Sequence, residues 1–516
     1  MSRKEAYVGI DIGTSSVKAG LLARDLYQVV TRPSGLATSP IGAAEQDARQ
    51  LWAAVVEAVR EVVRGAGDVH VRAVGLSGHS PSLVAATPSG YPVTPVITWM
   101  DRRPLLEGRR SLANLENSTD GRDGGPSFEA TAKWIANHHV LQAGCVCTLL
   151  QPKDFIVLRL TGRACIDSSS ASCLRWYDGA KGWDARGDRD IAAFLPSIVH
   201  PWEACGTVTA EAAHETGLPA GTPVASGGID AVVEALGAGI LEPGVACDAT
   251  GTSTCVSLVR PTEGDGGCVR HVAPGRFLSV APVSYTGGSL KWALSVLFPG
   301  EAEAVCDWRG LVAQAVEAST PGASGLVFIP HMVGQRSPRV NPHAQGAFVG
   351  LGPRHTRADM LRAVLEGCSY AVRESLEAVC PDHAVEEVRA VGSGAKHGPW
   401  LQIKADVLGV PYARMAVTEG AVLGAIILAG YCCGDFASVE EATGRLVRRR
   451  RVFEPHDDAR RVYEVMYEAY REASLGLRRA DEVLAGLRRE DARRSGAQAH
   501  ARTRDTEDGA CQEISS

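Results

Sequence analysis

The chain has 516 residues, of which 45% are hydrophobic and 22% are charged, and its formal net charge is −6 at pH 7. This composition is typical of a soluble globular protein. The length predicts two domains, or three, because a single core stops growing well below this size. The small net charge provides no attraction to nucleic acid or to an anionic membrane surface, so neither is an expected partner.

Segments for export or membrane insertion are not expected either. The longest apolar run, Ala421–Cys433, contains Gly424 and Gly430 and is too short to cross a bilayer. The N-terminus leads directly into a predicted strand without the apolar stretch of a signal peptide. The 14 cysteines are scattered and lack zinc-site spacing, which favours reduced thiols. These features predict a cytoplasmic protein.

The first 110 residues alternate between predicted strands and a helix, which favours an α/β domain. Asp47–Arg64 has the apolar spacing of an amphipathic helix. Strands are predicted over Tyr7–Ile12, Val17–Leu22, Val71–Ser77, Leu83–Ala86 and Val93–Trp99. A polar loop is expected at 110–130, and a helical, aromatic-containing stretch should follow to about residue 205.

The second half of the chain repeats this α/β character. Val224–Gly228 is a predicted strand that leads into a helix over Asp230–Ala238, and a buried helix is expected at Ala421–Leu428. Glycines between residues 237 and 244 predict a hinge. We therefore expect an N-terminal domain over 1–240 and a C-terminal domain over 245–487. The last segment, 488–516, loses apolar periodicity and is predicted to be a disordered tail.

One short pattern occurs twice, and it carries the most information about function. Residues 8–16 and 247–254 each run from an apolar β-type stretch through Gly-Thr into a second β-type stretch, as a hairpin with a tight glycine turn does. Such a turn exposes backbone N–H groups and hydroxyl donors, which a phosphate chain requires. The turn residues are Gly13, Thr14 and Ser15 in the first copy, and Gly251, Thr252 and Ser253 in the second. We therefore predict duplicated halves that hold one polyphosphate from both sides, in a phosphoryl-transfer enzyme.

Phosphoryl transfer to an alcohol also needs Mg²⁺ to offset charge and a carboxylate to take the hydroxyl proton. Asp230 follows Gly227 and Gly228 at a predicted strand-to-helix junction. From the residues alone, Asp230 is either the general base or a carboxylate that only complements the helix dipole. Asp11 is the expected Mg²⁺ partner, through water, with an Asx-type turn residue as the alternative. The chain has no Walker-type, G-x-S-x-G or H-E-x-x-H motif, which disfavours P-loop kinases, serine hydrolases and zinc peptidases.

Several further motifs follow one another in the order of a known family. They are Asp11–Ser15, Glu45–Asp47 ahead of Leu51 and Trp52, Gln151–Phe155 followed by Leu160–Gly162, and, most specific, Gly346–Leu351 with Asp359, Met360, Ala363 and Glu366 after it. On these residues the chain, from about residue 6 to 475, resembles the FGGY carbohydrate kinases of the actin/sugar-kinase/Hsp70 ATPase superfamily. The resemblance implies an α/β fold of two actin-like (ribonuclease H-like) domains with a central cleft. It also implies an ATP- and Mg²⁺-dependent kinase for a hydroxyl of a small sugar or polyol.

The resemblance implies roles for individual residues as well. Asp230 matches the family's catalytic aspartate and, together with Asp11, would contact Mg²⁺. The segment after the predicted strand Val388–Val391 resembles the adenosine-binding motif, with Gly392, Gly394 and Ala395 as its contacts. In the family, the acceptor is held by the loop after the 71–77 strand, by a Trp-x-Asp segment and by the base. The matching residues here are His79, Ser80, Pro81, Trp99, Asp101 and Asp230.

The acceptor loop departs from the xylulokinase pattern. Xylulokinases usually carry Gln-Met-His where this chain has His79–Pro81, and Asn where it has Met100, whereas Tyr285–Trp292 is xylulokinase-like. The family's Gly-Glu-Arg-x-Pro appears as Gly334–Pro338. A pentulose is the leading acceptor, and another ketose, a sugar acid or a short polyol are alternatives. A non-catalytic nucleotide- or sugar-binding regulator and an inactive paralogue are the rival classes, and the resemblance implies a homodimer.

Overall fold

The computed structural model describes residues 4–487 except 25, 40–41, 105–127, 141–146, 175, 185–188, 261, 263–267, 305–307 and 381–384. The predicted tail over 488–516, and most of the polar loop predicted over 110–130, lie outside the described residues. No helix in the described ranges is long and apolar enough to cross a bilayer.

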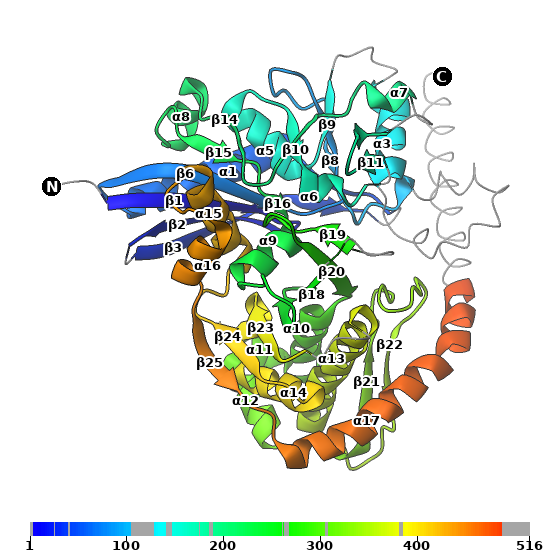
Figure 1. The fold of residues 1–516 in the computed structure, drawn as a ribbon. Coiled ribbons are helices and arrows are strands. Elements are labelled where there is room, and N and C mark those ends of the chain that lie inside the picture. Colours follow the sequence, from blue (N-terminus) through cyan, green and yellow to red (C-terminus); the bar gives the residue numbers. More distant parts are fainter. Residues whose placement is uncertain are drawn as a thin grey trace, which may run out of the picture.

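Two sheets of seven strands form the centres of two α/β halves (Figure 1). The strands of the first sheet are β1 (Lys4–Ile12), β2 (Ser16–Ala23), β3 (Leu26–Pro33), β6 (Val69–Gly78), β14 (Ala204–Thr207), β15 (Pro223–Ala225) and β16 (Gly228–Ile229). The strands of the second sheet are β17 (Val245–Thr250), β18 (Thr254–Arg260), β19 (Cys268–Arg270), β20 (Phe277–Val283), β23 (Glu387–Val391), β24 (Tyr412–Met415) and β25 (Arg449–Phe453).

The two sheets share one plan, which confirms the predicted duplication. In each, an antiparallel hairpin (β1–β2 or β17–β18) is flanked by a parallel strand beside its first strand, β6 or β23. An antiparallel strand, β3 or β20, lies beside the second strand of the hairpin. The two Gly-Thr turns therefore occupy equivalent places in the two halves.

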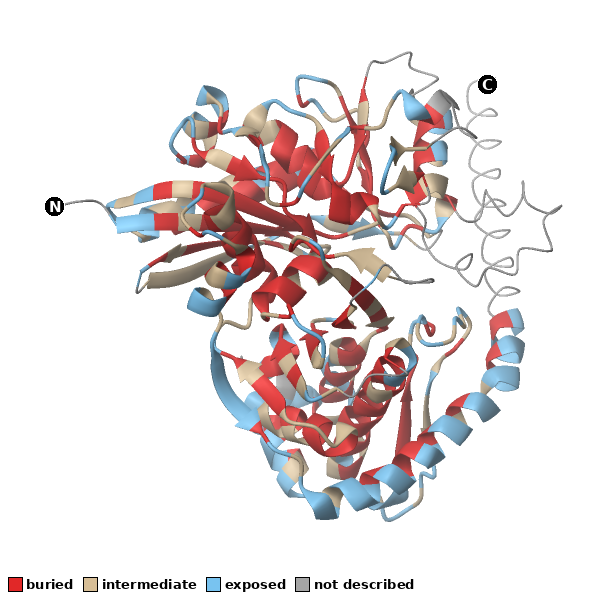
Figure 2. Ribbon diagram, in the orientation of Figure 1, coloured by how far each residue is buried: buried red, intermediate tan, exposed pale blue. Residues whose placement is uncertain are grey.

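Helices cover the sheets, and capping residues stabilise the N-termini of several of them. The principal ones are α1 (Ala48–Gly65), α5 (Pro152–Thr161), α8 (Ala210–Thr216), α9 (Asp230–Gly237), α10 (Thr286–Leu297), α12 (Arg309–Glu317), α13 (Arg357–Val379), α14 (Gly398–Leu408), α15 (Gly420–Cys432), α16 (Val439–Leu446) and α17 (Asp457–Gly476). Asp47 caps α1 by accepting from the N–H of Arg49 at 2.7 Å. Thr356 and Asp359 form a capping box at α13. Figure 2 shows the central strands of both sheets and α13 largely buried, whereas much of α17 is exposed.

Helices α9 and α15 lie at the junction of the two halves, as Figure 1 shows. Helix α15 packs on β1 and β6 of the first sheet and also contacts α9. A Cβ at Gly75 would collide with the carbonyl oxygen of Ala425, and one at Gly424 with that of Val233. Glycine is therefore needed at both positions to let the backbones approach this closely. This close packing confirms the buried helix predicted over Ala421–Leu428.

The segment up to residue 205 differs from its prediction of a helical stretch. It contains α3 (Phe128–Ile135) and α5, but also the short strands β9 (Thr148–Leu150), β10 (Cys165–Asp167) and β13 (Ser197–Val199). Strand β3 was likewise not predicted. The short strands β9, β10 and β13 are stabilised by pairing with distant segments, such as β10 with β13, which local periodicity does not reveal.

Candidate active site

The first Gly-Thr hairpin joins β1 to β2. The N–H of Gly13 donates to the carbonyl of Ser16 at 3.0 Å and closes the turn. Asp11, at the end of β1, is buried and accepts from the hydroxyl of Ser77 at 3.0 Å. Burial raises the pKa of Asp11, and the charge of Lys18, its register partner on β2, opposes this. The hairpin thus presents hydroxyl and N–H donors beside a carboxylate.

The second hairpin joins β17 to β18 in the same way. The N–H of Gly251 donates to the carbonyl of Ser253 at 2.8 Å, and the Thr252 side chain is exposed. The carbonyl of Thr252 accepts from the N–H of Gly288 in the first turn of α10, at 2.9 Å. The turn is held by its backbone, so its hydroxyl groups stay available to a ligand.

The predicted adenosine motif lies directly against this second hairpin. Gly392 follows β23 with φ of 79°, a left-handed conformation that favours glycine. A Cβ at Gly392 would meet the carbonyl oxygen of Thr250, and one at Gly394 would meet the Thr250 side chain. Ala395 is buried beneath them. The structure therefore brings together the residues predicted to hold adenosine and those predicted to hold the phosphates.

Asp230 begins α9, at the junction between the two halves. Its Oδ1 accepts from the N–H of Ala231 at 2.7 Å. Burial, followed by the charge of the neighbouring Asp11, raises the pKa of Asp230 to about 7, while the Ala231 hydrogen bond and the charges of Arg336 and Lys18 oppose the rise. A general base is most effective with a pKa near the working pH. The structure thus places Asp230 close to the acid of the first hairpin, with the proton affinity that the predicted role requires.

A lysine that no sequence motif singled out, Lys18, lies among these carboxylates. Lys18 pairs with Glu419 at 3.0 Å, and Glu419 also pairs with Lys396 of the adenosine segment at 3.1 Å. Glu234 lies one helical turn after Asp230, and burial raises its pKa to about 8. The position of Lys18 opposite Asp11 in a hairpin is the pattern that could have revealed it.

On the acceptor side, His79 is part of a closed hydrogen-bond network. Gln46 donates its amide N–H to the carbonyl of Thr14 at 2.9 Å, so its Oε1 faces His79 Nε2, at 3.1 Å. His79 Nε2 therefore carries the proton and Nδ1 accepts from the Ser82 hydroxyl at 2.8 Å. Burial lowers the pKa of His79 to about 3. Both ring nitrogens have partners within the protein, and Ser80 and Pro81 next to His79 are half-buried. The predicted contact of these three residues with a sugar stays a prediction.

Asp101 also has hydrogen-bond partners within the protein, and its predicted contact with the acceptor stays a prediction. It is buried and accepts from the N–H of Ala44 at 3.0 Å and from the Arg103 guanidinium at 2.7 Å. Arg103 also pairs with Glu45 and lies 4.7 Å from the ring centre of Trp134. Asp101 thus positions Arg103, a residue that the sequence analysis did not select although it lies two residues away.

Trp99 connects the acceptor side to the first hairpin. Its Nε1 donates to the Thr14 hydroxyl at 2.9 Å, and its backbone N–H donates to Ser82 at 2.9 Å. The guanidinium of Arg336 lies 5.2 Å from its ring centre. The ring is half-buried and so has a face near the predicted acceptor region. Gln46 and Arg336 both lie in motifs that the resemblance used, but nothing in the sequence assigned them a place in the site.

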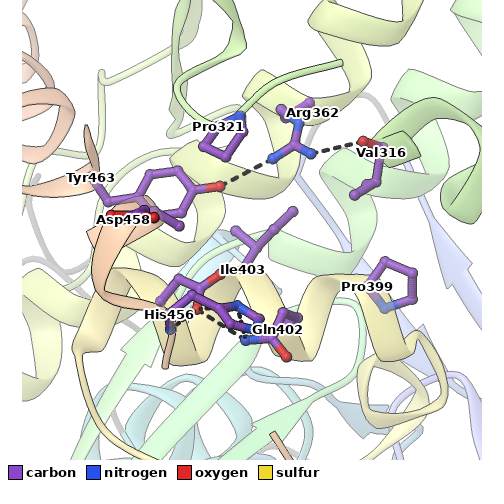
Figure 3. Close-up of a pocket in the computed structure, with 11 residues that line it drawn as sticks. Val316, Pro321, Arg362, Pro399, Gln402, Ile403, His456, Asp458 and Tyr463 are labelled. Carbon is purple, nitrogen blue, oxygen red and sulfur yellow. Dashed lines mark hydrogen bonds and ion pairs between the residues drawn. The ribbon is translucent and has the colours of Figure 1, made fainter. Parts of the chain in front are cut away.

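A cavity of about 400 Å³ lies elsewhere, between α12, α14 and α17 (Figure 3). There Arg362 donates to the carbonyl of Val316 at 2.7 Å and to the Tyr463 hydroxyl at 3.1 Å. None of the residues predicted for the site lines it. The cavity is therefore separate from the predicted central cleft, which stays a prediction.

Duplicated α/β halves with equivalent Gly-Thr hairpins, around an aspartate of near-neutral pKa, define an actin-like phosphotransferase. Two family models match the chain: the N-terminal domain of the FGGY family of carbohydrate kinases over residues 6–237, and its C-terminal domain over 249–433. The chain belongs to the FGGY family of carbohydrate kinases, enzymes that phosphorylate a sugar hydroxyl.

Individual proteins of this family are similar over nearly the whole chain. A xylulose kinase of Staphylococcus epidermidis is 29% identical over 487 residues, which cover 90% of this chain and 96% of that protein. A gluconokinase of Bacillus subtilis is 27% identical, with 89% and 93% covered. The crystal structure of a xylulose kinase from Rhodospirillum rubrum superposes with a TM-score of 0.77 at 27% identity, covering 92% of this chain and 100% of that one.

Proposed function

We propose that this kinase transfers the γ-phosphoryl group of ATP to a hydroxyl of a pentulose, with Asp230 as the general base. The observation that carries the proposal is the placement of Asp230 at the start of α9, beside Asp11 of the first hairpin and with a pKa raised to about 7. Thr14 and Thr252 at the two turns would bind the phosphates, and the Gly392–Ala395 segment the adenosine.

The residues of the chain divide the chemistry between them. Asp230 accepts the proton of the acceptor hydroxyl as its oxygen attacks the γ-phosphorus. The N–H and hydroxyl groups of Gly13–Ser15 and Gly251–Ser253 bind the phosphate oxygens from two sides and align the γ-phosphoryl group. Trp99 links the first turn to the acceptor side, so both substrates are oriented by one rigid unit.

The acidic residues fit a magnesium ion held mainly by the nucleotide. Mg²⁺ is usually bound by one or two carboxylates, substrate phosphates and water. The charge of Asp11 is near enough to raise the pKa of Asp230, and the described residues contain no group of three or more metal-ligating side chains. When bound, Mg²⁺ offsets the negative charge of the phosphates, and we propose that Asp11 and Asp230 hold it there.

The choice of a pentulose rests on the relatives, several of which are xylulose kinases. A sugar acid is the second candidate, because a gluconokinase is also similar and because the guanidinium of Arg336 lies 5.2 Å from the ring centre of Trp99. Rates of ADP release with D-xylulose, D-gluconate, glycerol and other sugars would decide between them. We expect the highest kcat/KM with D-xylulose. Sugar binding without ADP release from any acceptor would show a non-catalytic regulator instead.

The general base is tested by Asp230→Asn. Loss of a positioned base lowers rates by about 10²–10⁴-fold, so we expect kcat to fall by that factor while calorimetry still detects ATP binding. Asp458→Asn, an exposed position on α17, is the matched control and should leave kcat unchanged. Near-normal turnover of Asp230→Asn with the true acceptor would refute the assignment.

A further inference from the structure

Arg336 lies in a loop of the second half that reaches Trp99 of the first half. The loop connects β21 (Val327–Pro330) to β22 (Gly346–Val349). It is closed at its base by a reciprocal backbone pair between Gln335 and Asn341, both hydrogen bonds being 2.9 Å. Arg339 further along the loop pairs with Glu374 on α13. The position of Arg336 is therefore set by a braced loop rather than by its own contacts.

The guanidinium of Arg336 has no hydrogen bond or ion pair to any residue that the structure describes, although its surroundings are polar. It is exposed to solvent. At the same time, desolvation by surrounding protein lowers its pKa. An exposed arginine that has no carboxylate partner faces a space that a ligand can enter, and its guanidinium is free to bind the oxygens of an anionic ligand there.

Three neighbours of Arg336 locate that space. Trp99, whose ring centre is 5.2 Å away, is hydrogen-bonded to Thr14 of the first hairpin. Cys255, which interacts electrostatically with Arg336, lies in β18 directly after the second hairpin. Asp230, the third neighbour, is the proposed base. Arg336 thus lies where both phosphate-binding turns and the base converge.

We propose that Arg336 contacts the γ-phosphoryl group during transfer and stabilises the charge on its oxygens. The inference rests on the proposed function of the same site. In the reaction, the acceptor oxygen forms a bond to the γ-phosphorus while the bond from that phosphorus to the β,γ-bridging oxygen breaks. The bridging electron pair leaves with ADP, and the acceptor proton passes to Asp230. Arg336 donates N–H hydrogen bonds to the oxygens of the phosphoryl group that is being transferred, as arginine does when it binds phosphate in a bidentate way.

The geometry favours this role over two others. A residue that only held the far end of a sugar would need to face the acceptor side alone, whereas Arg336 also adjoins the stem of the second hairpin at Cys255. A purely structural arginine would be paired within the chain, as Arg339 and Arg103 are. Because Arg336 comes from the second half and its ring partner Trp99 from the first, the contact also makes catalysis depend on the two halves being together.

The test compares Arg336→Ala, Arg336→Lys and Arg339→Ala in the full-length protein, with ADP release measured on the acceptor that the wild type uses. A charge that acts mainly in the transition state is worth about 10²–10³-fold in kcat. We expect that loss in Arg336→Ala, with the KM values for ATP and acceptor changed by less than about threefold. Arg336→Lys should retain intermediate activity, and added guanidinium chloride at non-denaturing concentration should restore part of the activity of Arg336→Ala.

Each other outcome overturns the inference. A kcat of Arg336→Ala near that of the wild type would do so, as would a raised acceptor KM with unchanged kcat. Equal losses in Arg336→Ala and Arg339→Ala, without guanidinium rescue, would show that the loop position matters rather than the charge. A wild type that releases no ADP with any acceptor would overturn the proposed function itself, whereas an active wild type with a fully active Arg336→Ala overturns this inference alone.

Discussion

The two Gly-Thr hairpins occupy equivalent places in the two sheets, yet they are stabilised in different ways. In the first, the carbonyl of Thr14 accepts from Gln46 at 2.9 Å and from the Ser34 hydroxyl at 2.6 Å, and its own hydroxyl accepts from Trp99. Gln46 continues through His79 to Ser82. The first hairpin is therefore connected by side chains to the acceptor side.

The second hairpin is supported from beneath by a buried polar cluster in its own half. Asp248 accepts from Lys404 at 2.6 Å and from the Tyr412 hydroxyl at 2.9 Å. The hydroxyls of Thr250 and Thr254 bond each other at 2.8 Å, and Lys404 also donates to Thr250. None of these groups belongs to the acceptor side. The duplicated element thus has two tasks: the first copy links the phosphates to the acceptor, and the second is a rigid platform for the nucleotide.

The largest expected effect comes from removing the cation beneath the second hairpin. Lys404→Met leaves Asp248 buried without its partner, which costs about 3–5 kcal/mol of unfolding free energy. Adding Asp248→Asn should recover part of the loss. Lys396→Met, which removes a more exposed pair with Glu419, should cost less than about 1 kcal/mol. Denaturant unfolding measures all three, and a Lys404→Met cost as small as that of Lys396→Met would contradict the platform interpretation.

Acid should weaken the hydrogen-bond network that holds the first hairpin, because His79 takes up a proton when the protein unfolds. The pKa of His79 is lowered to about 3 by burial, from an unfolded value near 6.5. The unfolded state therefore binds more protons in this range, and stability falls as pH drops below 6.5. The loss at pH 4.5 is about 2–3 kcal/mol.

His79→Gln should flatten this pH dependence, because no group at position 79 would then take up a proton on unfolding. His214→Gln, an exposed position on α8, is the control and should leave the slope unchanged. Thermal unfolding of each variant at pH 7.5 and 4.5 measures the difference. Equal slopes for the wild type and His79→Gln would show that His79 titrates normally.

The difference between the two hairpins also shows which features of the fold and site can be predicted from the sequence. The structure confirms the turns at Gly13 and Gly251, the strands that flank them and the helix that begins at Asp230. These features could be predicted because Gly-Thr turns and apolar periodicity depend on residues that are close together in the sequence. The side chains that hold the two hairpins in place come from distant parts of the chain. Gln46 reaches a turn 32 residues earlier, and Lys404 reaches a strand 156 residues earlier, so no window of sequence contains both partners.

The same reasoning accounts for the acceptor residues. A motif match predicts that His79 and Asp101 lie near the acceptor, but it does not tell which protein groups their polar atoms contact. The structure shows that Gln46 is a hydrogen-bond partner of His79 and that Arg103 is one of Asp101. Arg336 shows the converse case, since its importance follows from the absence of a partner among the described residues.

A smaller effect is expected where the second hairpin touches α10. A Cβ at Gly287 would collide with the carbonyl oxygen of Gly251. Gly287→Ala should therefore displace the turn and cost about 1–3 kcal/mol of stability, with a raised KM for ATP. Gly300 has open space around it, so Gly300→Ala should be neutral or slightly stabilising. If both variants melt and bind ATP alike, the contact between α10 and the turn does not hold the hairpin.

The smallest effects distinguish the two turns most directly. Thr14→Val and Thr252→Val each remove one hydroxyl, which is worth about 0.5–1.5 kcal/mol, or up to about tenfold in KM for ATP. The Thr14 hydroxyl also accepts from Trp99, so Thr14→Val leaves that indole N–H unpaired and should raise the acceptor KM as well. Thr252 is exposed and has no such connection on the acceptor side, so Thr252→Val should change the KM for ATP alone. Steady-state kinetics with each substrate varied in turn separates these patterns. An acceptor KM that responds equally to both substitutions would mean that the two hairpins are functionally equivalent, and the division of tasks between them would be wrong.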